Sequence, residues 1–321
     1  MRKVIFDCDT GTDDAVALML LVLSKKFDVL GVTCTWGNQP VESTADNTLR
    51  VLDFMGSDIK VYKGCSQPLD KKLQDQRIES STEGPIYYTD EKGMIHHLHP
   101  EHLWIPETKR KPEEKNAVDF IIETCLNSEE KITIVPVGPT SNIGTALKKE
   151  PKIAEHIDSI VFMGGSVHTG NVSATAEANF WNDPDSIKVI MDSGVHCVVA
   201  TLDATTSASL DVKKDGETLK NAGSKYARFA GEILEWRADV ESHLGWTDGI
   251  LEAVHDPLAV AYLIDPSIAK KIERHQVTID TSTGERAGTL LLDTGEGNPN
   301  VDLILETDPK DYLKMWLDYL K

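Results

Sequence analysis

The chain has 321 residues and a formal net charge of −19, with 52 Asp and Glu residues against 33 Lys and Arg. Nucleic acids and anionic membrane surfaces attract proteins through Lys and Arg, so this charge balance argues against both partners and favours a small, neutral or cationic ligand. The five cysteines are spread along the chain without a CxxC pair, which argues against a disulfide framework and predicts a reduced, cytoplasmic protein.

We expect one domain over residues 1–321, because this length suits a single large α/β domain. The N-terminus shows no signal-peptide pattern. The longest apolar run, 15–23, is about half of the roughly 20 residues that a membrane span needs, so no span is expected.

Short β-branched runs alternate with segments of helical periodicity along most of the chain. The runs that predict buried strands are 4–9, 29–36, 132–138, 159–165 and 196–203. The segments that predict helices are 13–24, 41–54, 117–126 and 184–191. This order predicts an α/β fold with a doubly wound, mostly parallel central sheet flanked by helices. Ligands of such sheets bind beyond the carboxyl ends of the strands.

Three stretches depart from the alternation. The polar segment 66–114 is too long for an ordinary loop and predicts a lid or insertion. The segment 205–250 is mostly helical, and we expect it to lie over the site. After residue 274, two strands joined by a glycine-containing turn and a closing helix at 308–320 predict a small C-terminal β-hairpin and helix extension.

The stretch VIFDCDTGTDDAVAL (4–18) places four aspartates, Asp7, Asp9, Asp13 and Asp14, between two apolar runs. Two carboxylates about 4 Å apart repel each other by roughly 4 kcal/mol at an effective dielectric constant near 20. The cluster must therefore stay partly protonated or bind a cation, and a hard, oxygen-binding cation is the economical answer. A helix cap with solvated acidic residues is the structural alternative. A phosphatase DxD motif fits poorly, because Gly11 stands where that motif has Thr or Val.

The segment DCDTGTDDAVAL resembles the DxDxGxDDAxAL signature of the inosine–uridine-preferring nucleoside hydrolases, a family of calcium-dependent N-ribohydrolases. Further segments resemble family motifs in the same order. They are GN (37–38), IVPVGPTSNI (134–143), MGG with GNVSATAEANFWNDP (163–184) and HDP (255–257). Together they span most of the chain, so the resemblance predicts hydrolysis of ribonucleosides to base and ribose.

The resemblance also implies roles for individual residues. It assigns Ca²⁺ to Asp9, Asp14, the main-chain carbonyl of Val137 and Asp256. It assigns Asp9 as general base and His255 to leaving-group activation, which suits a titratable imidazole. The residues implied in substrate binding are Asp13, Asn38, Met163, Asn171, Glu177 and Asn179, with Asp7 supporting the cluster. A homodimer or homotetramer is implied as well.

Several points stay open at this level. The 84–102 flap departs from the family pattern, and its histidines, His96, His97, His99 and His102, could bind zinc, although a solvated lid fits their spacing better. Trp236 or Trp246 could stack on a base, but aromatic residues at helical spacing are usually core. A non-catalytic, calcium-dependent ribonucleoside-binding protein is the alternative function.

Overall fold

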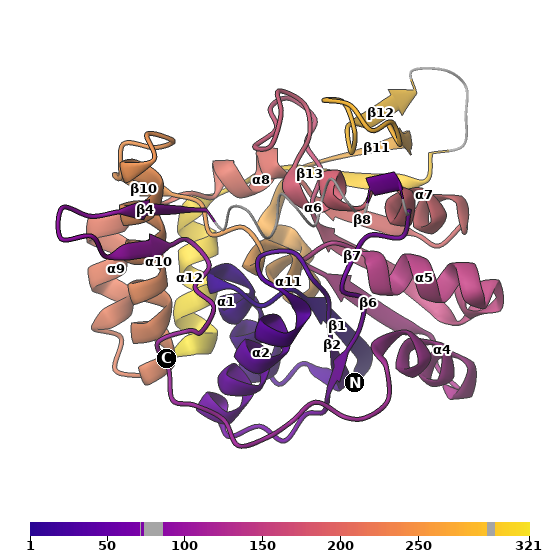
Figure 1. Cartoon of the computed structure of the whole chain (residues 1–321), viewed down its shortest axis with the longest axis horizontal. Coiled ribbons are helices and arrows are strands. Elements are labelled where there is room, and N and C mark those ends of the chain that lie inside the picture. The colour runs from indigo at the N-terminus through magenta and orange to yellow at the C-terminus, as the bar shows by residue number, and fades with distance from the viewer. Residues whose placement is uncertain (71, 74–85, 294–298) are drawn as a thin grey trace.

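The computed structural model describes residues 1–70, 72–73, 86–293 and 299–321. A nine-stranded sheet forms its centre, in the order β12-β11-β13-β8-β7-β6-β1-β2-β3 (Figure 1). The strands are β1 (Arg2–Cys8), β2 (Phe27–Cys34), β3 (Val61–Lys63), β6 (Ile132–Pro136), β7 (Ile157–Met163), β8 (Cys197–Ala200), β11 (Ala269–Ile279), β12 (Leu290–Asp293) and β13 (Val301–Thr307). Seven neighbouring strands of this sheet run parallel to one another, namely β3, β2, β1, β6, β7, β8 and β13. The remaining two strands, β11 and β12, run antiparallel to their neighbours.

The predicted mostly parallel sheet is confirmed, and all five predicted strands are present. The sequence reading missed β3 and β13. Every residue of β13 except Glu306 is buried, although Asp302 near its start interrupts the apolar pattern. Because β13 lies between β8 and β11, the predicted C-terminal hairpin extends the edge of the central sheet and is not a separate appendage.

Helices cover both faces of the sheet. They are α1 (Thr12–Leu23), α2 (Val41–Met55), α4 (Ala117–Asn127), α5 (Ser141–Lys149), α6 (Ala178–Asn182), α7 (Pro184–Asp192), α8 (Leu202–Ser207), α9 (Val212–Lys220), α10 (Lys225–His243), α11 (Pro257–Ile264) and α12 (Pro309–Leu320). Alternate side chains of β1 enter the two cores, Val4 and Phe6 on one face and Ile5 on the other. The first core also contains side chains of α1, α2 and α10 to α12, and the second contains those of α4, α5 and α7.

Two short hairpins lie beside the main sheet. Strands β4 (Tyr87–Thr89) and β5 (Ile95–His97) form one within the predicted 66–114 insertion, of which residues 71 and 74–85 lie outside the described part. Strands β9 (Leu210–Asp211) and β10 (Leu251–Glu252) pair at the two ends of the predicted 205–250 segment, with α9 and α10 between them. The β4–β5 hairpin lies against α10 in Figure 1.

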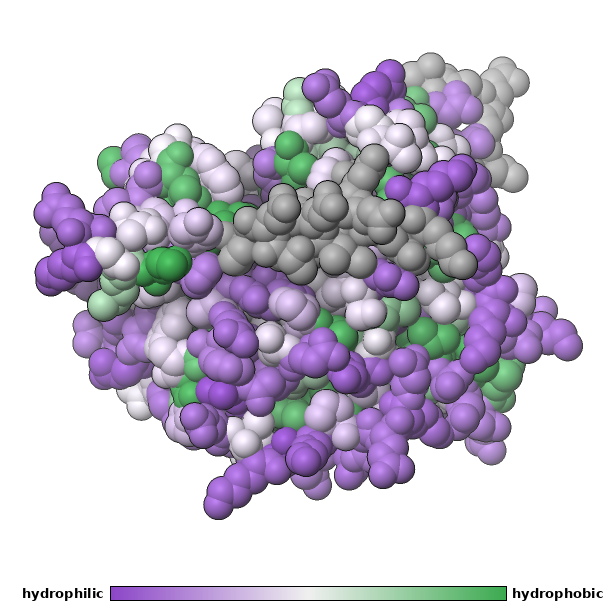
Figure 2. Space-filling view, in the orientation of Figure 1, coloured by the Kyte–Doolittle hydropathy of each residue, from purple (hydrophilic) through white to green (hydrophobic). Residues whose placement is uncertain are grey.

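Hydrophilic side chains predominate on the face shown in Figure 2, with hydrophobic ones in separate patches. None of the described helices combines the length and the apolar character that crossing a bilayer requires. All five cysteines are free thiols.

Candidate active site

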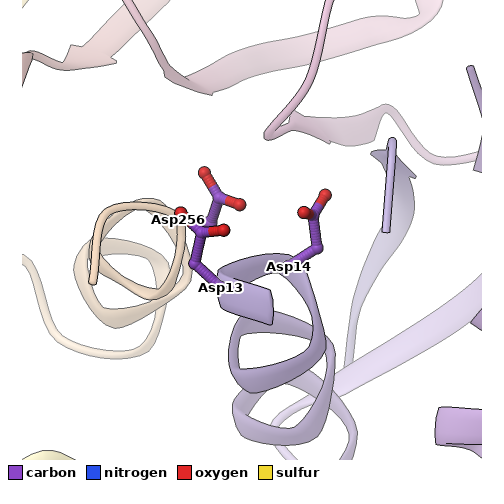
Figure 3. A group of neighbouring side chains, drawn as sticks. All are labelled: Asp13, Asp14 and Asp256. Carbon is purple, nitrogen blue, oxygen red and sulfur yellow. The ribbon is translucent and has the colours of Figure 1, made fainter. Parts of the chain in front are cut away.

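Four aspartates meet where β1 ends and where α1 and α11 begin. Asp9 follows the last residue of β1, Asp13 and Asp14 lie in the first turn of α1, and Asp256 directly precedes α11. One carboxylate oxygen from each of Asp13, Asp14 and Asp256 lies within 4.8 Å of the other two. Figure 3 shows these three side chains pointing into one space above the helix ends. Helix N-termini favour carboxylates, which explains part of this arrangement but not its density.

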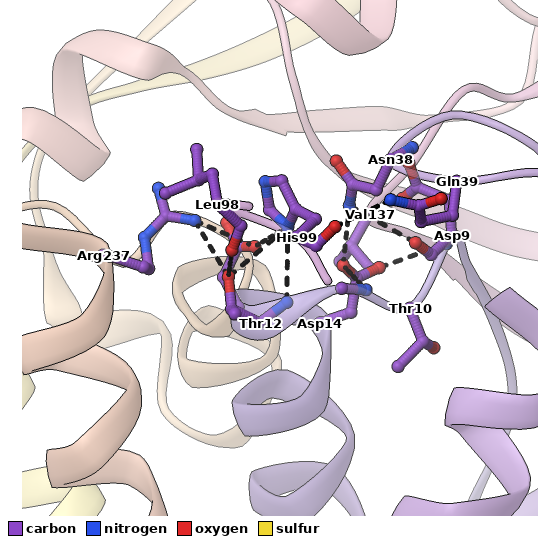
Figure 4. A network of polar contacts seen from close by, with 12 residues as sticks. Asp9, Thr10, Thr12, Asp14, Asn38, Gln39, Leu98, His99, Val137 and Arg237 are labelled. Atoms are coloured by element: carbon purple, nitrogen blue, oxygen red, sulfur yellow. Dashed lines mark hydrogen bonds and ion pairs between the residues drawn. The ribbon is translucent and has the colours of Figure 1, made fainter. Parts of the chain in front are cut away.

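Asn38 holds Asp9 beside Asp14 (Figure 4), and two glycines leave room for the Asp9 carboxylate. The backbone N–H of Asn38 donates to Asp9 Oδ2 at 2.7 Å, and its side-chain amide donates to Asp14 Oδ2 at 3.1 Å. The Asp9 N–H donates to Asp14 Oδ1 at 3.1 Å. A Cβ atom on Gly37 or Gly138 would lie 2.1 or 2.3 Å from an Asp9 carboxylate oxygen, so side chains are excluded at both positions. Asp9 Oδ1 is buried and receives no hydrogen bond from the described residues.

Burial and mutual repulsion decide the protonation of the cluster. Burial, followed by repulsion from Asp14, raises the pKa of Asp9 well above its ordinary value. Burial and repulsion from Asp13 raise the pKa of Asp14 to about 6. The pKa of Asp256 is also raised well above its usual range by burial and by its three neighbours. Burial alone would raise the pKa of Asp13, but attraction to the Arg237 guanidinium lowers it. The cluster therefore contains carboxyls that retain protons unless a cation is present.

A second group of predicted residues lies at the ends of β6 and β7. The side-chain amide of Asn179 donates to the carbonyl of Val137 at 2.9 Å and to that of Met163 at 3.2 Å. Glu177 caps α6, and its carboxylate receives three backbone N–H groups. Burial raises the pKa of Glu177 to about 7 despite these donors. The structure thus brings the predicted sugar-binding segment onto the carbonyl that was predicted as a metal ligand.

Two predicted residues have mainly structural partners. Asn171 lies on an exposed loop, where its side-chain oxygen accepts the N–H of Ala178 at the start of α6. Asp7 Oδ1 accepts from the hydroxyl of Thr33 at 2.5 Å and from the amide of Asn142 at 2.8 Å. Asp7 therefore ties β1 to β2 and α5 beneath the cluster, in keeping with a supporting position.

Two histidines flank the aspartates. His255 Nδ1 lies 2.8 Å from the hydroxyl of Thr205, and burial together with Arg237 lowers its pKa to about 4. His99 Nδ1 accepts the N–H of Thr12 at 3.3 Å, so the neutral ring carries its proton on Nε2. Burial lowers the pKa of His99 to about 4 as well. Both imidazoles are therefore neutral at pH 7.

Arg237 of α10 contributes the cation nearest to the cluster. Its Nη1 lies 3.3 Å from both the hydroxyl of Thr12 and Asp13 Oδ1. Its Nε donates to Glu252 and its Nη2 to Glu241, each at 3.1 Å. Only 2% of its side chain is exposed. This buried guanidinium therefore links α1, α10 and β10.

The β4–β5 hairpin is fixed to α10 by aromatic side chains. Trp236 Nε1 donates to the carbonyl of His97 at 2.9 Å, and the Tyr88 hydroxyl donates to Asp239 at 2.7 Å. The indole N–H of Trp236 is therefore used in a hydrogen bond to the hairpin. Trp246, in contrast, is 58% exposed. This hairpin leads directly to His99.

The four flap histidines do not form a zinc site within the part of the chain that the structure describes. His96 pairs with Asp90, His99 with Asp13 and His102 with Asp46, so their ring nitrogens face different partners. The aspartate group is the only cluster of three or more potential metal ligands found among the described residues.

Sequence reasoning missed the site positions of His99 and Arg237. His99 was considered only with the flap, whose contacts do not follow from its sequence. Arg237 did carry a signal, because it lies on the buried stripe of α10 that includes Ile233, Leu234 and Val240. A charged residue in an apolar stripe is rarely buried without a partner.

The chain matches known nucleoside hydrolases over nearly its whole length. The family model described as inosine–uridine preferring nucleoside hydrolase matches residues 4–314. The pyrimidine-specific ribonucleoside hydrolase RihA of Escherichia coli O81 (strain ED1a) is 31% identical over 327 aligned positions, which cover 99% of this chain and 98% of the relative. A purine-preferring ribonucleoside hydrolase from Gardnerella vaginalis superimposes with a TM-score of 0.84 at 27% identity, covering 99% and 98% of the two chains. A plant nucleoside hydrolase also superimposes with a TM-score of 0.84, at 24% identity over 99% and 98% of the chains. The chain belongs to the inosine–uridine-preferring nucleoside hydrolase family.

Proposed function

We propose that this nucleoside hydrolase cleaves the N-glycosidic bond of ribonucleosides in a calcium-dependent site formed by Asp9, Asp14, the Val137 carbonyl and Asp256. The observation that carries the proposal is the buried aspartate cluster, in which carboxylate oxygens of Asp13, Asp14 and Asp256 lie within 4.8 Å of one another. When bound, Ca²⁺ supplies positive charge that orients sugar hydroxyls and makes a neighbouring water easier to deprotonate.

The residues present fit a hard cation. All the side chains of the cluster offer oxygen, which Ca²⁺ prefers, and no described His or Cys joins the group. Asp9 Oδ1 is buried without a hydrogen-bond donor, and such an orphaned oxygen calls for a ligand. The group of carboxylate oxygens within 4.8 Å of one another contains Asp13, whereas the resemblance assigns Asp9 as a calcium ligand. Asp9 adjoins this group, because its N–H donates to Asp14 Oδ1 at 3.1 Å and the two carboxyls repel each other.

We assign Asp9 as the general base, and its hydrogen bonding supports this role. Asn38 fixes one of its oxygens and leaves the other free to accept a proton from water. The cleavage passes through an oxocarbenium-like transition state, in which an adjacent negative charge stabilises the sugar. Asp13 is the carboxylate that stays ionised, which suits it to bind the 2′-hydroxyl. Asn179 contacts the Val137 carbonyl and Glu177 accepts the Asn179 N–H, and we assign both residues to sugar binding.

The leaving base needs a hydrogen-bond donor or a proton. His255 and His99 are both neutral at pH 7, so each can donate an N–H without the cost of burying a charge. The contact between His99 Nδ1 and the N–H of Thr12 directs the His99 proton to Nε2. We therefore assign His255 and His99 jointly to the base side of the site.

We propose ribonucleosides as the substrate class, since the relatives include both a pyrimidine-specific and a purine-preferring enzyme. We also propose that the β4–β5 hairpin acts as part of a lid, since it is fixed to α10 and leads to His99. Free thiols support a cytoplasmic enzyme, where released base and ribose enter nucleoside salvage. A homodimer or homotetramer follows from the resemblance and is tested by light scattering after gel filtration.

The decisive experiment measures free ribose released from uridine, cytidine, inosine and adenosine, with Ca²⁺ or with a chelator. We expect release with Ca²⁺ only, and a loss of about 10²- to 10⁴-fold for Asp9→Asn, the usual effect of removing a general base. Asp302→Asn is the matched control, because Asp302, near the start of β13, pairs with Arg274 of β11 and does not belong to the aspartate cluster. Binding of nucleosides with Ca²⁺ but without any ribose release would identify a binding protein instead. Release unaffected by the chelator would refute the metal requirement.

A further inference from the structure

We propose that Arg237 is a positioning residue for ribose recognition: it fixes Asp13 Oδ1 so that the other Asp13 oxygen faces the 2′-hydroxyl. This inference rests on the proposed function. The carrying observation is that Nη1 of Arg237 lies 3.3 Å from Asp13 Oδ1 and 3.3 Å from the hydroxyl of Thr12, the first two residues of α1.

The guanidinium itself has little freedom to move. Glu241, one turn later on α10, and Glu252, on β10, accept hydrogen bonds from its other two nitrogens at 3.1 Å. The exposed fractions of these side chains are 2% for Arg237, 14% for Glu241 and 0% for Glu252. The third nitrogen, Nη1, donates to the hydroxyl of Thr12, so each nitrogen of the planar fork has an acceptor and the guanidinium has one orientation. In that orientation Nη1 faces Asp13 Oδ1 at 3.3 Å as an ion pair, and this oxygen has no hydrogen-bond partner among the described residues.

Asp13 needs such a partner because it lies among like charges. Among the described ion pairs, Arg237 is the only Lys or Arg that contacts an aspartate of the cluster. One divalent cation cannot neutralise four carboxylates. Without Arg237, the lowest-energy position of the Asp13 carboxylate would lie further from Asp14 and Asp256, because repulsion between buried like charges is strong.

The proposal also explains why a charge interrupts the buried face of α10. A purely structural helix would place an apolar residue there, since replacing buried ion pairs by apolar side chains is often neutral or stabilising. A helix that positions Asp13 must keep the cation. The 205–250 segment would then contribute to sugar recognition through α10 without contacting the sugar.

The test uses the triple variant Arg237→Met, Glu241→Gln, Glu252→Gln, which removes the cation together with its two other carboxylate partners. Arg237→Lys is the second variant, because it keeps the charge but lacks the fork. Arg50→Met is the matched control, since Arg50 is a buried arginine that pairs with Asp46 outside the site. Thermal melting and calcium titration calorimetry establish that each variant folds and binds Ca²⁺.

The readout is the ratio of kcat/KM for uridine and 2′-deoxyuridine, or for inosine and 2′-deoxyinosine. We expect the triple variant to lower this ratio about 30-fold, the scale of one charge-assisted hydrogen bond, with the loss confined to the ribonucleoside. Arg237→Lys should be intermediate, and Arg50→Met should match the wild type. Equal losses on both substrates, or an unchanged ratio, would overturn the proposal. If the triple variant fails to fold, the ratio of Arg237→Lys decides alone.

Failure of the proposed function has a separate signature, which is a wild type that hydrolyses no nucleoside. In that case the same nucleoside pairs are compared by calorimetry on the calcium-loaded protein. A wild-type preference for the 2′-hydroxyl that the Arg237 variants lose would support the positioning role. A preference that the variants keep, or no preference in the wild type, would overturn it.

Discussion

Replacing Asp256 by Asn should stabilise the metal-free protein and destabilise the calcium-loaded protein, each relative to the wild type. Asp256 makes no side-chain capping hydrogen bond to α11, so replacing it by the amide removes one charge from the cluster without loss of a helix cap. In the metal-free protein the wild type suffers from repulsion that the variant lacks. In the calcium-loaded protein the wild type gains a ligand that the variant lacks.

The distances set the magnitude. Carboxylate oxygens of Asp256, Asp13 and Asp14 lie within 4.8 Å of one another. One pair 4.8 Å apart repels by about 3.5 kcal/mol at an effective dielectric constant near 20, before partial protonation relieves part of the repulsion. Unfolding entropy scales with length, and for 321 residues about 3.5 kcal/mol corresponds to a melting shift of about 5 °C. Calcium at about 100 times its Kd would stabilise the wild type by about 2.7 kcal/mol, or about 4 °C.

The assay is differential scanning fluorimetry at pH 8 with a chelator or with Ca²⁺. We expect Asp256→Asn to melt above the wild type in chelator and below it in Ca²⁺. Asp302→Asn serves as the control and should keep the full calcium shift, because Asp302 pairs with Arg274 and does not belong to the aspartate cluster. A variant that melts below the wild type in both conditions would refute the repulsion argument, and a wild type without any calcium shift would refute the metal site.

Three further outcomes follow from single contacts. Burial raises the pKa of Asp7 to about 7, so the folded protein binds an extra proton and loses stability as pH rises from about 4 to about 7. The variant Asp7→Asn should remove up to about 4 kcal/mol of this loss, which urea unfolding without metal measures. Trp236→Phe removes the donor to His97 and should cost about 1 kcal/mol in thermal stability, with kcat/KM lowered alike for all bases. Gly138→Ala places a Cβ 2.3 Å from Asp9 Oδ1 and should abolish calcium binding by calorimetry.

Each of these outcomes has a control or a contrary result. Gly216→Ala on α9 meets only ordinary contacts, at 3.5 Å from Glu235, and should leave calcium binding unchanged. A strongly base-dependent loss in Trp236→Phe would instead show stacking on the base. A metal-free wild type that is equally stable at pH 5 and pH 8 would contradict the pKa assigned to Asp7.

The α/β order and the candidate metal-binding aspartates could be predicted from the sequence because both depend on local pattern. Buried parallel strands read as apolar runs, and the strand-to-turn-to-helix segment around Asp9 and Asp13 fixes which side chains share an end of the sheet. The strands β3 and β13 were not predicted. The three residues of β3 are too few to show a periodicity, and Asp302 interrupts the apolar run of β13.

The sequence by itself determined the family, the sheet and the acidic residues that gather at its carboxyl edge, because these depend on order along the chain. Only the tertiary structure decided that Arg237 reaches Asp13, that His99 lies on Thr12 and that Trp236 holds the hairpin. Each of these contacts joins residues more than 80 positions apart, and long-range contacts depend on how helices and loops pack, which no local pattern encodes.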